Sequence, residues 1–461
     1  MVAPSSARLA PSETSGAPRM TISADRTASG LALAVIGVGG LAVIGLWWSD
    51  TVFIDGFGSW LTNAGRITGL LAGYVIVVLL ALMARVPALE HTIGTDRLAR
   101  WHAMGGRYTV SLAVAHTLLI IWGYAVTANT GLVHETSSLL LTYPDVLMAT
   151  VALLLLVAVG VVSARAARRR LSYETWHFIH LYTYLAVALM FAHQFSTGAD
   201  FITNRPARVL WSAMYVAVGA ALVWYRLVVP INGAFRHRLH VVEVRPESRD
   251  VVSVYVSGRY VDELHAQPGQ FFRWRFLTRD LWWAANPYSL SAAPRPGLLR
   301  FTVKIAGRHS AALRQLQPGT AVLAEGPYGS FTAARRRRRN VLLIGAGVGI
   351  TPMRALLESM PGDPGDITLV YRASSPDDLV LRNEIDQIAA ARGARVHYAV
   401  GSRRRGRPDP LAVGRLQRLV PGLSHHDVFI CGPDDLAARL RKGLREAGVP
   451  AWNIHHESFT F

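Results

Sequence analysis

The sequence is poor in cysteine and in charge, and each shortage excludes a class of protein. Cys431 is the single cysteine among 461 residues, so a framework of intrachain disulfides is excluded. Charged residues make up only 17% of the chain and the mean hydropathy is +0.26, which predicts that much of it lies in lipid. No charged segment leads directly into a short apolar run with a cleavage site, so we expect no signal peptide.

The charge that is present is strongly basic, with a formal net charge of +18 at pH 7. Most of it lies in loops and in the C-terminal half. In a chain with long apolar runs, this is typical of positive-inside topology and of contact with anionic lipid or a nucleotide, so we expect no nucleic-acid partner. Residues 1–29, rich in Ala, Ser, Pro and Thr, are expected to form a disordered cytosolic tail.

Six apolar stretches follow, each about long enough to cross a bilayer. The loop after the second carries Arg85, Arg97 and Arg100, whereas the loops after the first and third carry mainly acidic residues. This alternation predicts a six-helix transmembrane domain over residues 30–230 of a multi-pass plasma (cytoplasmic) membrane protein with both termini in the cytosol. The predicted spans are Leu31–Trp48, Ile67–Met83, Met104–Val126, Val146–Val162, Phe178–Phe195 and Val209–Val229.

Four histidines occur in two apolar stretches. His102 and His116 are fourteen residues apart, and His180 and His193 are thirteen apart, which is about 20 Å of helix in each case. Imidazole in hydrocarbon is costly and marks function by default, although a lone buried histidine is more often a satisfied core residue. The third and fifth spans run in the same direction. His102 is therefore level with His180, and His116 with His193, so we predict two stacked haems, each held by two histidines.

The spacing in the fifth span conflicts with an ideal straight helix. Fourteen residues bring a helix back to within roughly 40° of the same face, whereas thirteen leave it about 140° away. We therefore expect a change of winding or a tilt between His180 and His193.

The start of the second span combines small residues with a cation. Gly65, Gly69 and Gly73 recur every four residues, a spacing typical of close helix packing in membranes. Arg66 lies among them near the predicted outer face. It is either a ligand for a haem propionate or a cation that extends to the interface.

Beyond Pro230 the pattern changes. Residues 235–334 contain short alternating runs separated by Gly and Pro, which predict a small antiparallel β-barrel. From Val341 strand and helix patterns alternate, which predicts a doubly wound α/β domain over residues 340–461. The run Arg335–Arg339 between them is either a solvated linker or a contact for acidic headgroups.

Two turns of the α/β region suit a nucleotide. The sequence GAGVGITP follows a predicted strand and opens a helix, so that its backbone can approach a pyrophosphate at the helix N-terminus. Its glycines are Gly345, Gly347 and Gly349. A later strand ends in Cys431, Gly432 and Pro433, which puts a thiol at the sheet edge where ligands of such folds bind. Alternatively, Cys431 is a small buried hydrophobe.

The β region carries two candidate flavin sites. An aromatic residue followed by a hydroxyl suits packing on an isoalloxazine ring, and this motif consists of Asn286, Pro287, Tyr288 and Ser289. A second set offers charge and backbone donors to a cofactor diphosphate, namely Lys304, Gly307 and Ser310. Ordinary β-barrel packing remains the alternative for both sets. The sequence GPYG at 326–329 indicates a turn.

With these motifs the C-terminal half resembles the ferredoxin–NADP reductase family. NPYS matches its flavin motif, GAGVGITP its nucleotide turn, CGP its distal motif, and Glu457-Ser458-Phe459 its closing acidic–aromatic pair. Together with the six spans and the histidine pairs, residues 30–461 resemble the NADPH oxidase and ferric reductase superfamily. Two positions depart from that pattern: Asn286 stands where the soluble reductases usually have Arg, and Ile120 where superoxide-forming members have a polar group.

The resemblance implies the cofactors FAD, NADPH and two haem b, with FAD held at Tyr288 and Ser289 and its phosphates near Lys304. His102 and His180 would bind the inner haem, and His116 and His193 the outer one.

For the nucleotide side, the resemblance implies that Thr351 and Cys431 border the hydride-transfer position. Phe459, or else Phe461, would cover the flavin until nicotinamide displaces it. Ser402 and Arg403 would bind the 2′-phosphate, which favours NADPH over NADH.

The implied function is transfer of electrons from cytosolic NADPH, through FAD and two haems, to an acceptor at the outer face. Two histidine ligands leave no open iron position, which favours a ferric chelate, a quinone or slow leakage to dioxygen over activation of bound oxygen. Two alternatives remain: a membrane-anchored NAD(P)H:flavin reductase with a cytosolic acceptor, and a proton-conducting or transport protein that uses the intramembrane histidines.

Overall fold

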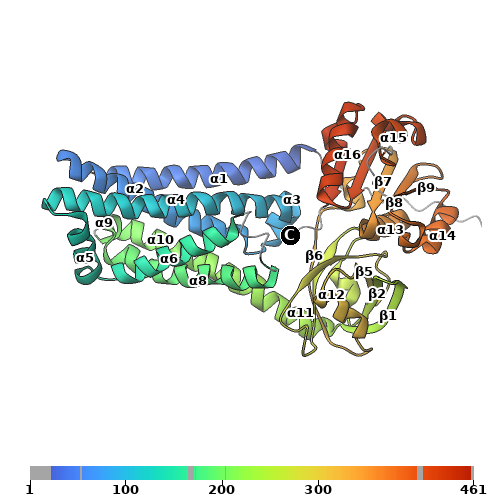
Figure 1. Ribbon diagram of the computed structural model, residues 1–461, viewed down its shortest axis with the longest axis horizontal. Coiled ribbons are helices and arrows are strands. Elements are labelled where there is room, and N and C mark those ends of the chain that lie inside the picture. Colours follow the sequence, from blue (N-terminus) through green and yellow to red (C-terminus); the bar gives the residue numbers. More distant parts are fainter. Residues whose placement is uncertain are drawn as a thin grey trace, which may run out of the picture.

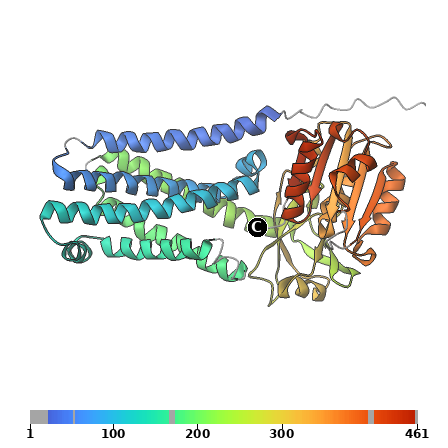
Figure 2. The same ribbon diagram turned by 45° about the horizontal axis from the view of Figure 1, so that its top comes forward.

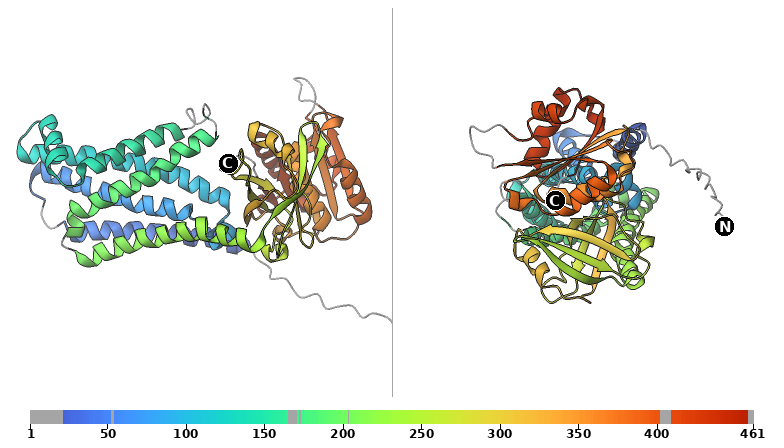
Figure 3. Two further views of the ribbon diagram at one scale, coloured as in Figure 1. Left: turned by 90° about the horizontal axis from the view of Figure 1, so that it is seen from below. Right: turned by 90° about the vertical axis from the view of Figure 1, so that its right-hand side faces the viewer.

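A long helical bundle carries two smaller modules at one end, which we call the module end (Figures 1 and 2). The computed structural model describes residues 22–51, 54–164, 171, 173–202, 204–401 and 409–457. Seen along the long axis, the modules lie one above the other across the end of the bundle (Figure 3).

Six helices of the bundle are long and apolar enough to cross a membrane, as the sequence predicted. Short helices connect them: α3 lies at the module end, whereas α5 lies at the far end (Figure 1). The bundle elements are α1 (Ile22–Ser49), α2 (Gly56–Leu82), α3 (Pro87–Ile93), α4 (Thr95–Ala128), α5 (Leu132–Thr142), α6 (Val146–Ser163), α8 (Tyr173–Ser196), α9 (Ala199–Ile202), α10 (Arg205–Val223), a π-helical turn (Trp224–Val228) and α11 (Val229–His237).

Both ends of the helical region differ from our prediction. Residues 22–29, expected in a disordered tail, belong to α1, because extending an existing helix is far easier than starting one. The rest of the expected tail, residues 1–21, lies outside the described residues. The last helix continues past Pro230 to His237, since Pro230 occupies the first turn of α11, where its missing N–H costs nothing.

The first module, which we call the β module, consists of two antiparallel three-stranded sheets, β1-β2-β5 and β4-β3-β6. Trp274, Phe272, Phe276 and Phe301 fill its core. Antiparallel pairing is as predicted, but the strands pair as two sheets joined by isolated bridges and not as a closed barrel. Its strands are β1 (His240–Ser248), β2 (Val251–Ser257), β3 (Phe271–Phe276), β4 (Asn286–Ser289), β5 (Leu298–Lys304) and β6 (Val322–Tyr328).

One sequence expectation in the β module was wrong. Residues 326–328, which indicated a turn, form the end of β6, where Tyr328 pairs with Phe271 of β3. Tertiary pairing along β3 therefore overrides the local preference of Gly and Pro.

The second module, which we call the α/β module, has a five-stranded parallel sheet in the order β11-β10-β7-β8-β9. Two hydrophobic clusters cover its faces, one with α13 and α14 and the other with α15 and α16. The chain winds outward in both directions from β7, so the switch point lies between β7 and β10, where ligands of such sheets bind. Its elements are β7 (Asn340–Ala346), α13 (Ile350–Ser359), β8 (Ile367–Ala373), α14 (Arg382–Arg392), β9 (Arg395–Val400), α15 (Val413–Leu419), β10 (His426–Cys431), α16 (Asp434–Glu446) and β11 (Ile454–Glu457).

The arginine run between the modules is held by carboxylates of the α/β module. Arg339 pairs with Asp366 at 3.0 Å and with Asp363 at 3.1 Å, and Arg336 lies 3.8 Å from Asp366. These contacts favour a linker over a headgroup site.

Candidate functional site

The four intramembrane histidines meet as two pairs between α4 and α8. The ring centroids of His102 and His180 are 6.0 Å apart, with 69° between the ring planes. The ring centroids of His116 and His193 are 6.4 Å apart, with 63° between the planes. The first pair is nearer the module end and the second nearer the far end, so we call them the near pair and the far pair.

These separations fit one metal ion between the two rings of each pair. A metal–imidazole bond is about 2 Å long and the ring centroid lies roughly 1 Å behind the nitrogen, so imidazoles on opposite sides of one metal have centroids roughly 6 Å apart.

Backbone carbonyls orient the α4 histidines. Nδ1 of His102 lies 3.2 Å from the carbonyl oxygen of Leu79, and Nδ1 of His116 lies 2.8 Å from that of Gly65. A carbonyl only accepts, so each Nδ1 carries the proton in this contact and Nε2 keeps the lone pair that a metal needs. This second hydrogen bond is the usual support of a metal-binding histidine.

The α8 histidines have different neighbours. Nδ1 of His193 lies 3.0 Å from Oγ1 of Thr197. The ring of His180 stacks on Trp176, with centroids 5.1 Å apart and 26° between the planes. Its Nδ1 is buried and has no hydrogen-bond partner among the described residues, an expensive state for a polar atom without a ligand.

The expected change of winding in the fifth span is not found. α8 is an uninterrupted α-helix through both histidines. Of our two explanations for the thirteen-residue spacing, a tilt of the helix remains.

Close packing of α2 on α4 explains the glycine spacing. A Cβ at Gly69 would lie 2.6 Å from Nδ1 of His116, and one at Gly65 would lie 2.8 Å from Ile120. The glycines therefore let α2 approach the far histidine pair.

Arg66 lies beside that pair and already has a counter-ion. Its Nη2 lies 2.6 Å from Oδ1 of buried Asp200, and its Nη1 donates to Asn63 at 3.1 Å. Nε of Arg66 is buried without a partner among the described residues. The guanidinium thus keeps donor capacity toward a propionate, although its charge is balanced.

The flavin motif forms β4, antiparallel to β3. Tyr288 stacks on Phe301 with centroids 5.4 Å apart and 13° between the planes, and burial raises the pKa of its hydroxyl. Ser289 is buried one residue further, while Asn286 and Pro287 are half-buried. Tyr288 therefore remains neutral and one face of its ring rests on the β-module core.

The second flavin set is arranged differently from our expectation. Lys304 lies 3.2 Å from Asp250 and lines a cavity together with Gly347, so it faces the nucleotide turn. The N–H of Gly307 donates to Oγ of Ser310 at 3.1 Å, as an N-terminal helix cap. Strand β5 ends between the modules, which alternating sequence patterns do not reveal.

The two nucleotide motifs meet at the switch point of the sheet. Cys431 is in register with Gly345 on one side and with Glu457 on the other. A Cβ at Gly349 would collide with the carbonyl oxygen of Cys431, so only glycine allows the two turns to approach this closely. Gly347 has φ +55°, which also favours glycine.

A cavity of about 430 Å³ opens beside these turns. Its wall includes residues of both motifs, three cations and five aspartates: Gly347, Val348, Gly432, Pro433, Lys304, Arg372, Arg439, Asp250, Asp378, Asp409, Asp434 and Asp435. Two of the cations are already paired, Lys304 with Asp250 and Arg439 with Asp435. The feature that suits a dinucleotide pyrophosphate is the set of backbone N–H groups at the start of α13.

Two expected hydride-site residues are buried beside this cavity. Burial, and secondarily the charge of Glu457, raises the pKa of the Cys431 thiol. The thiol thus remains protonated and is no nucleophile. Thr351 is buried, and its hydroxyl donates to the carbonyl oxygen of Val348 at 3.0 Å. Ser402, Arg403, Phe459 and Phe461 lie outside the described residues.

The contacts between the bundle and the β module, which we call the bundle joint, were not predicted from the sequence. Arg85, just beyond α2, forms an ion pair with Glu325 of β6, and its guanidinium lies 3.3 Å from the hydroxyl of Tyr328. Arg85 has φ +62°, which is rare for an arginine and needs support from its surroundings. Beyond this ion pair, the ring centroids of Phe178 on α8 and Trp283 in the β module are 6.3 Å apart. The sequence feature that pointed to Arg85 was the basic charge of the loop after the second span, which indicated only the side of the membrane.

A buried carboxyl lies in the same joint. Burial raises the pKa of Glu90 on α3 to about 7, although the charges of Arg85 and Arg226 oppose the shift.

Two family models match this chain. The model described as the ferric reductase like transmembrane component matches residues 68–191, and that of the oxidoreductase NAD-binding domain matches residues 343–442. The first match includes His102, His116 and His180 and ends just before His193, and the second includes both nucleotide turns.

Curated relatives and solved structures resemble this chain over part of its length. Ferredoxin–NADP reductase B of Sorangium cellulosum is 30% identical over 190 residues, covering 37% of this chain and 77% of that protein. The flavohemoprotein of Bordetella pertussis is 29% identical, covering 54% and 68%. A ferredoxin NADP+ reductase from Neisseria gonorrhoeae with bound FAD and NADP is 16% identical, covering 49% and 99%, with a TM-score of 0.41.

Proposed function

Because this chain belongs to the ferredoxin–NADP reductase family, we propose that it carries electrons from NADPH, through FAD and two haems, across a membrane. A ferric-reductase-like transmembrane component precedes its NAD-binding domain. The protein is thus an NAD(P)H-dependent membrane oxidoreductase. The haems, the preference for NADPH, the acceptor and the orientation are our proposals.

The histidine geometry carries this proposal. Both pairs have the ring separation of two ligands on one metal, and both α4 histidines donate through Nδ1 to a backbone carbonyl. The residues therefore fit two haems with two histidine ligands each: His102 with His180, and His116 with His193. Arg66 is positioned to bind a propionate of the far haem.

In the modules, we assign FAD to the flavin motif and NADPH to the cavity at the switch point. When bound, FAD accepts a hydride, which is two electrons and a proton, from NADPH, and each haem iron carries one electron at a time. Tyr288 and Ser289 would hold the flavin ring. Lys304 and the N-terminus of α13 would bind the dinucleotide phosphates, and neutral Cys431 would border the nicotinamide.

The protein itself supplies position and insulation. With haem bound, the four imidazoles would supply two ligands to each iron, so no open iron site would remain for an acceptor. An acceptor at the far end would then be reduced without binding to iron, which favours a ferric chelate, a quinone or slow leakage to dioxygen over activation of bound oxygen. The basic loops at the module end favour a cytosolic location for the modules in a plasma membrane.

Cofactor counting tests this function. We expect two low-spin haems b and one FAD per purified chain. His116→Leu and His193→Leu should each remove one haem and leave the near one, while His134→Leu, an exposed histidine on far-end helix α5, should leave two. A wild-type protein with FAD and no haem would instead be a membrane-anchored flavin reductase.

A further inference from the structure

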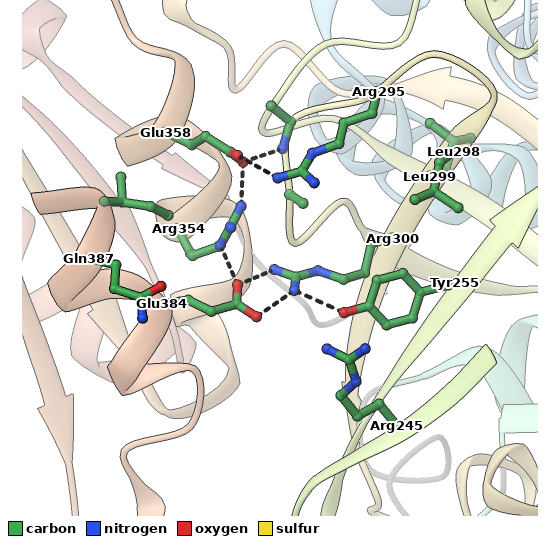
Figure 4. Close-up of a pocket in the computed structure, with 13 residues that line it drawn as sticks. Arg245, Tyr255, Arg295, Leu298, Leu299, Arg300, Arg354, Glu358, Glu384 and Gln387 are labelled. Atoms are coloured by element: carbon green, nitrogen blue, oxygen red, sulfur yellow. Dashed lines mark hydrogen bonds and ion pairs between the residues drawn. The ribbon is translucent and has the colours of Figure 1, made fainter. Parts of the chain in front are cut away.

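A second cavity, of about 420 Å³, lies between the β module and helices α13 and α14. Two acidic and four basic side chains line it: Glu358, Glu384, Arg245, Arg295, Arg300 and Arg354 (Figure 4). The dashed contacts in Figure 4 join Arg300 of β5 to Glu384 of α14, and Glu358 of α13 to Arg295 in the loop before β5. The function proposed above leaves this cluster without a role.

Glu384 of α14 is the centre of the cluster. Its two carboxylate oxygens accept hydrogen bonds from the two terminal nitrogens of Arg300, at 2.8 and 2.9 Å. One of them also accepts from Nε of Arg354 on α13 at 2.9 Å. Both arginine side chains are only 6% exposed, and charge-assisted pairs of this kind are directional as well as strong.

Glu358 of α13 extends the same network to the β module. It accepts a hydrogen bond from the backbone N–H of Ala293 at 2.9 Å, lies 3.5 Å from Arg295, and is ion-paired with Arg354. One helix of the α/β module thus holds the backbone of a β-module loop directly.

The network connects the two cofactor motifs by very short stretches of chain. Arg300 donates to the carbonyl oxygen of Ser291 at 2.9 Å and to its hydroxyl at 3.1 Å. Ser291 comes two residues after Ser289 of the flavin motif. Arg354 comes three residues after Thr351, on the helix that the nucleotide turn opens. A shift of Glu384 would therefore move one motif relative to the other.

We propose that Glu384 is a positioning residue that sets the register between the flavin and the nicotinamide. Hydride transfer requires the reacting atoms to lie about 3–3.5 Å apart, and a misplacement of about 1 Å can cost roughly 100-fold in rate. Buried ion pairs are weak sources of stability because their desolvation is costly. Two arginines buried where the two modules meet are better explained by this geometric task.

The proposal rests on the function proposed above, because it needs NADPH and FAD on the two sides of the cluster. The step itself transfers one hydride from C4 of the nicotinamide to the flavin, which leaves NADP+ and reduced flavin. Glu384 touches neither cofactor and acts through Arg300 and Arg354.

Glu384→Gln in the full-length protein tests this inference, because it keeps the size of the side chain and removes its charge. Flavin reduction should be measured by rapid mixing at saturating NADPH. We expect it to slow by about 10- to 100-fold, while the KM for NADPH stays within about twofold. Glu446→Gln, which changes an exposed glutamate on α16 paired with Lys442, is the matched control and should react like the wild type.

A second readout needs no turnover. Amide hydrogen exchange of residues 290–296 should be faster in Glu384→Gln than in the wild type, because Arg300 no longer holds the loop against α14. Should Glu384→Gln fail to fold, Arg300→Lys replaces it: the charge stays, the two-pronged geometry is lost, and hydride transfer should again slow.

Unchanged flavin reduction in a folded variant would overturn the inference, as would slower reduction that saturating NADPH fully restores. Either result leaves the proposed function intact. A wild-type protein that does not oxidise NADPH would refute the function first.

Discussion

The β module has two joints, and they differ in kind. Toward the α/β module, Glu384 binds buried Arg300 of the β module and Glu358 binds the backbone N–H of Ala293, through contacts of 2.8 to 2.9 Å. Toward the bundle, the contacts include the ion pair of Arg85 with Glu325, its Tyr328 neighbour and the aromatic pair Phe178–Trp283. An exposed ion pair of Arg236 on α11 with Glu263 lies in the same joint.

This difference matches the kind of transfer proposed across each joint, a hydride toward the α/β module and single electrons toward the bundle. A hydride moves only between atoms nearly in contact, at about 3–3.5 Å. Single electrons tolerate a longer and less exact separation between cofactors. A joint with a buried arginine toward the nucleotide, and one with partly exposed ion pairs toward the membrane, fit the proposed sequence of transfers.

We expect the largest loss of electron transfer from substitution of His180, the proposed haem ligand on α8 in the near pair. His180→Leu should remove the near haem and abolish electron flow from NADPH into the bundle. Flavin reduction should persist, because its joint is untouched. Absorption spectra of flavin and haem, recorded after anaerobic NADPH addition, separate the two steps. Normal reduction of the far haem in this variant would show that electrons bypass the near pair.

A smaller effect is expected at the ion pair itself. Arg85→Met leaves the carboxylate of Glu325 buried without its main partner, a loss of about 3–5 kcal/mol for such pairs. We expect haem reduction by NADPH to slow by at least about tenfold. NADPH-dependent reduction of ferricyanide, a soluble acceptor taking electrons from the flavin, should not change.

Lys442→Met is the control for this experiment, because Lys442 pairs with Glu446 at an exposed position within α16, away from the joint. Equal loss of ferricyanide reduction in Arg85→Met would mean that Arg85 supports the β module generally and not its docking on the bundle.

The smallest effect is a difference in pH response between the joints. The folded pKa of Glu90 is raised from 4.5 to about 7, so the folded protein binds more protons between these values and loses stability as pH rises through them. Burial would also raise the pKa of Glu384, but hydrogen bonds from Arg300 and the charge of Arg354 outweigh it and lower that pKa. The bundle joint should therefore weaken from pH 5 to 8 while the other does not.

Glu90→Gln measures this contrast. Thermal unfolding of the wild type should lose roughly 1–3 kcal/mol between pH 5 and 8 through this group, and the variant should lose less. An identical pH slope in wild type and variant would exclude Glu90 as its source.

Periodicity and motif position predicted the elements that depend on local sequence. The six apolar helices, the alternating strands and the turn at Gly345–Gly349 could all be read in this way. The pairing of His102 with His180 also followed, because two helices of known direction place residues at known depths.

The joints could not be predicted, because they depend on contacts between residues far apart in the chain. Arg85 and Glu325 are separated by 240 positions and Arg300 and Glu384 by 84, and each is an ordinary charged residue in its own segment. The place of Lys304 was missed for the same reason. Its strand ends between the modules, where the nucleotide turn is also a neighbour.

Transfer of electrons across the membrane is the central claim, and sided vesicles test it most directly. The protein would be reconstituted with its modules facing outward, a membrane-impermeant ferric chelate trapped inside, and NADPH added outside. The account predicts reduction of the trapped chelate in wild-type vesicles, and none with His193→Leu. The contradicting result would be wild-type vesicles that oxidise NADPH with an acceptor outside but reduce no acceptor inside, whether the trapped chelate, dioxygen or a quinone.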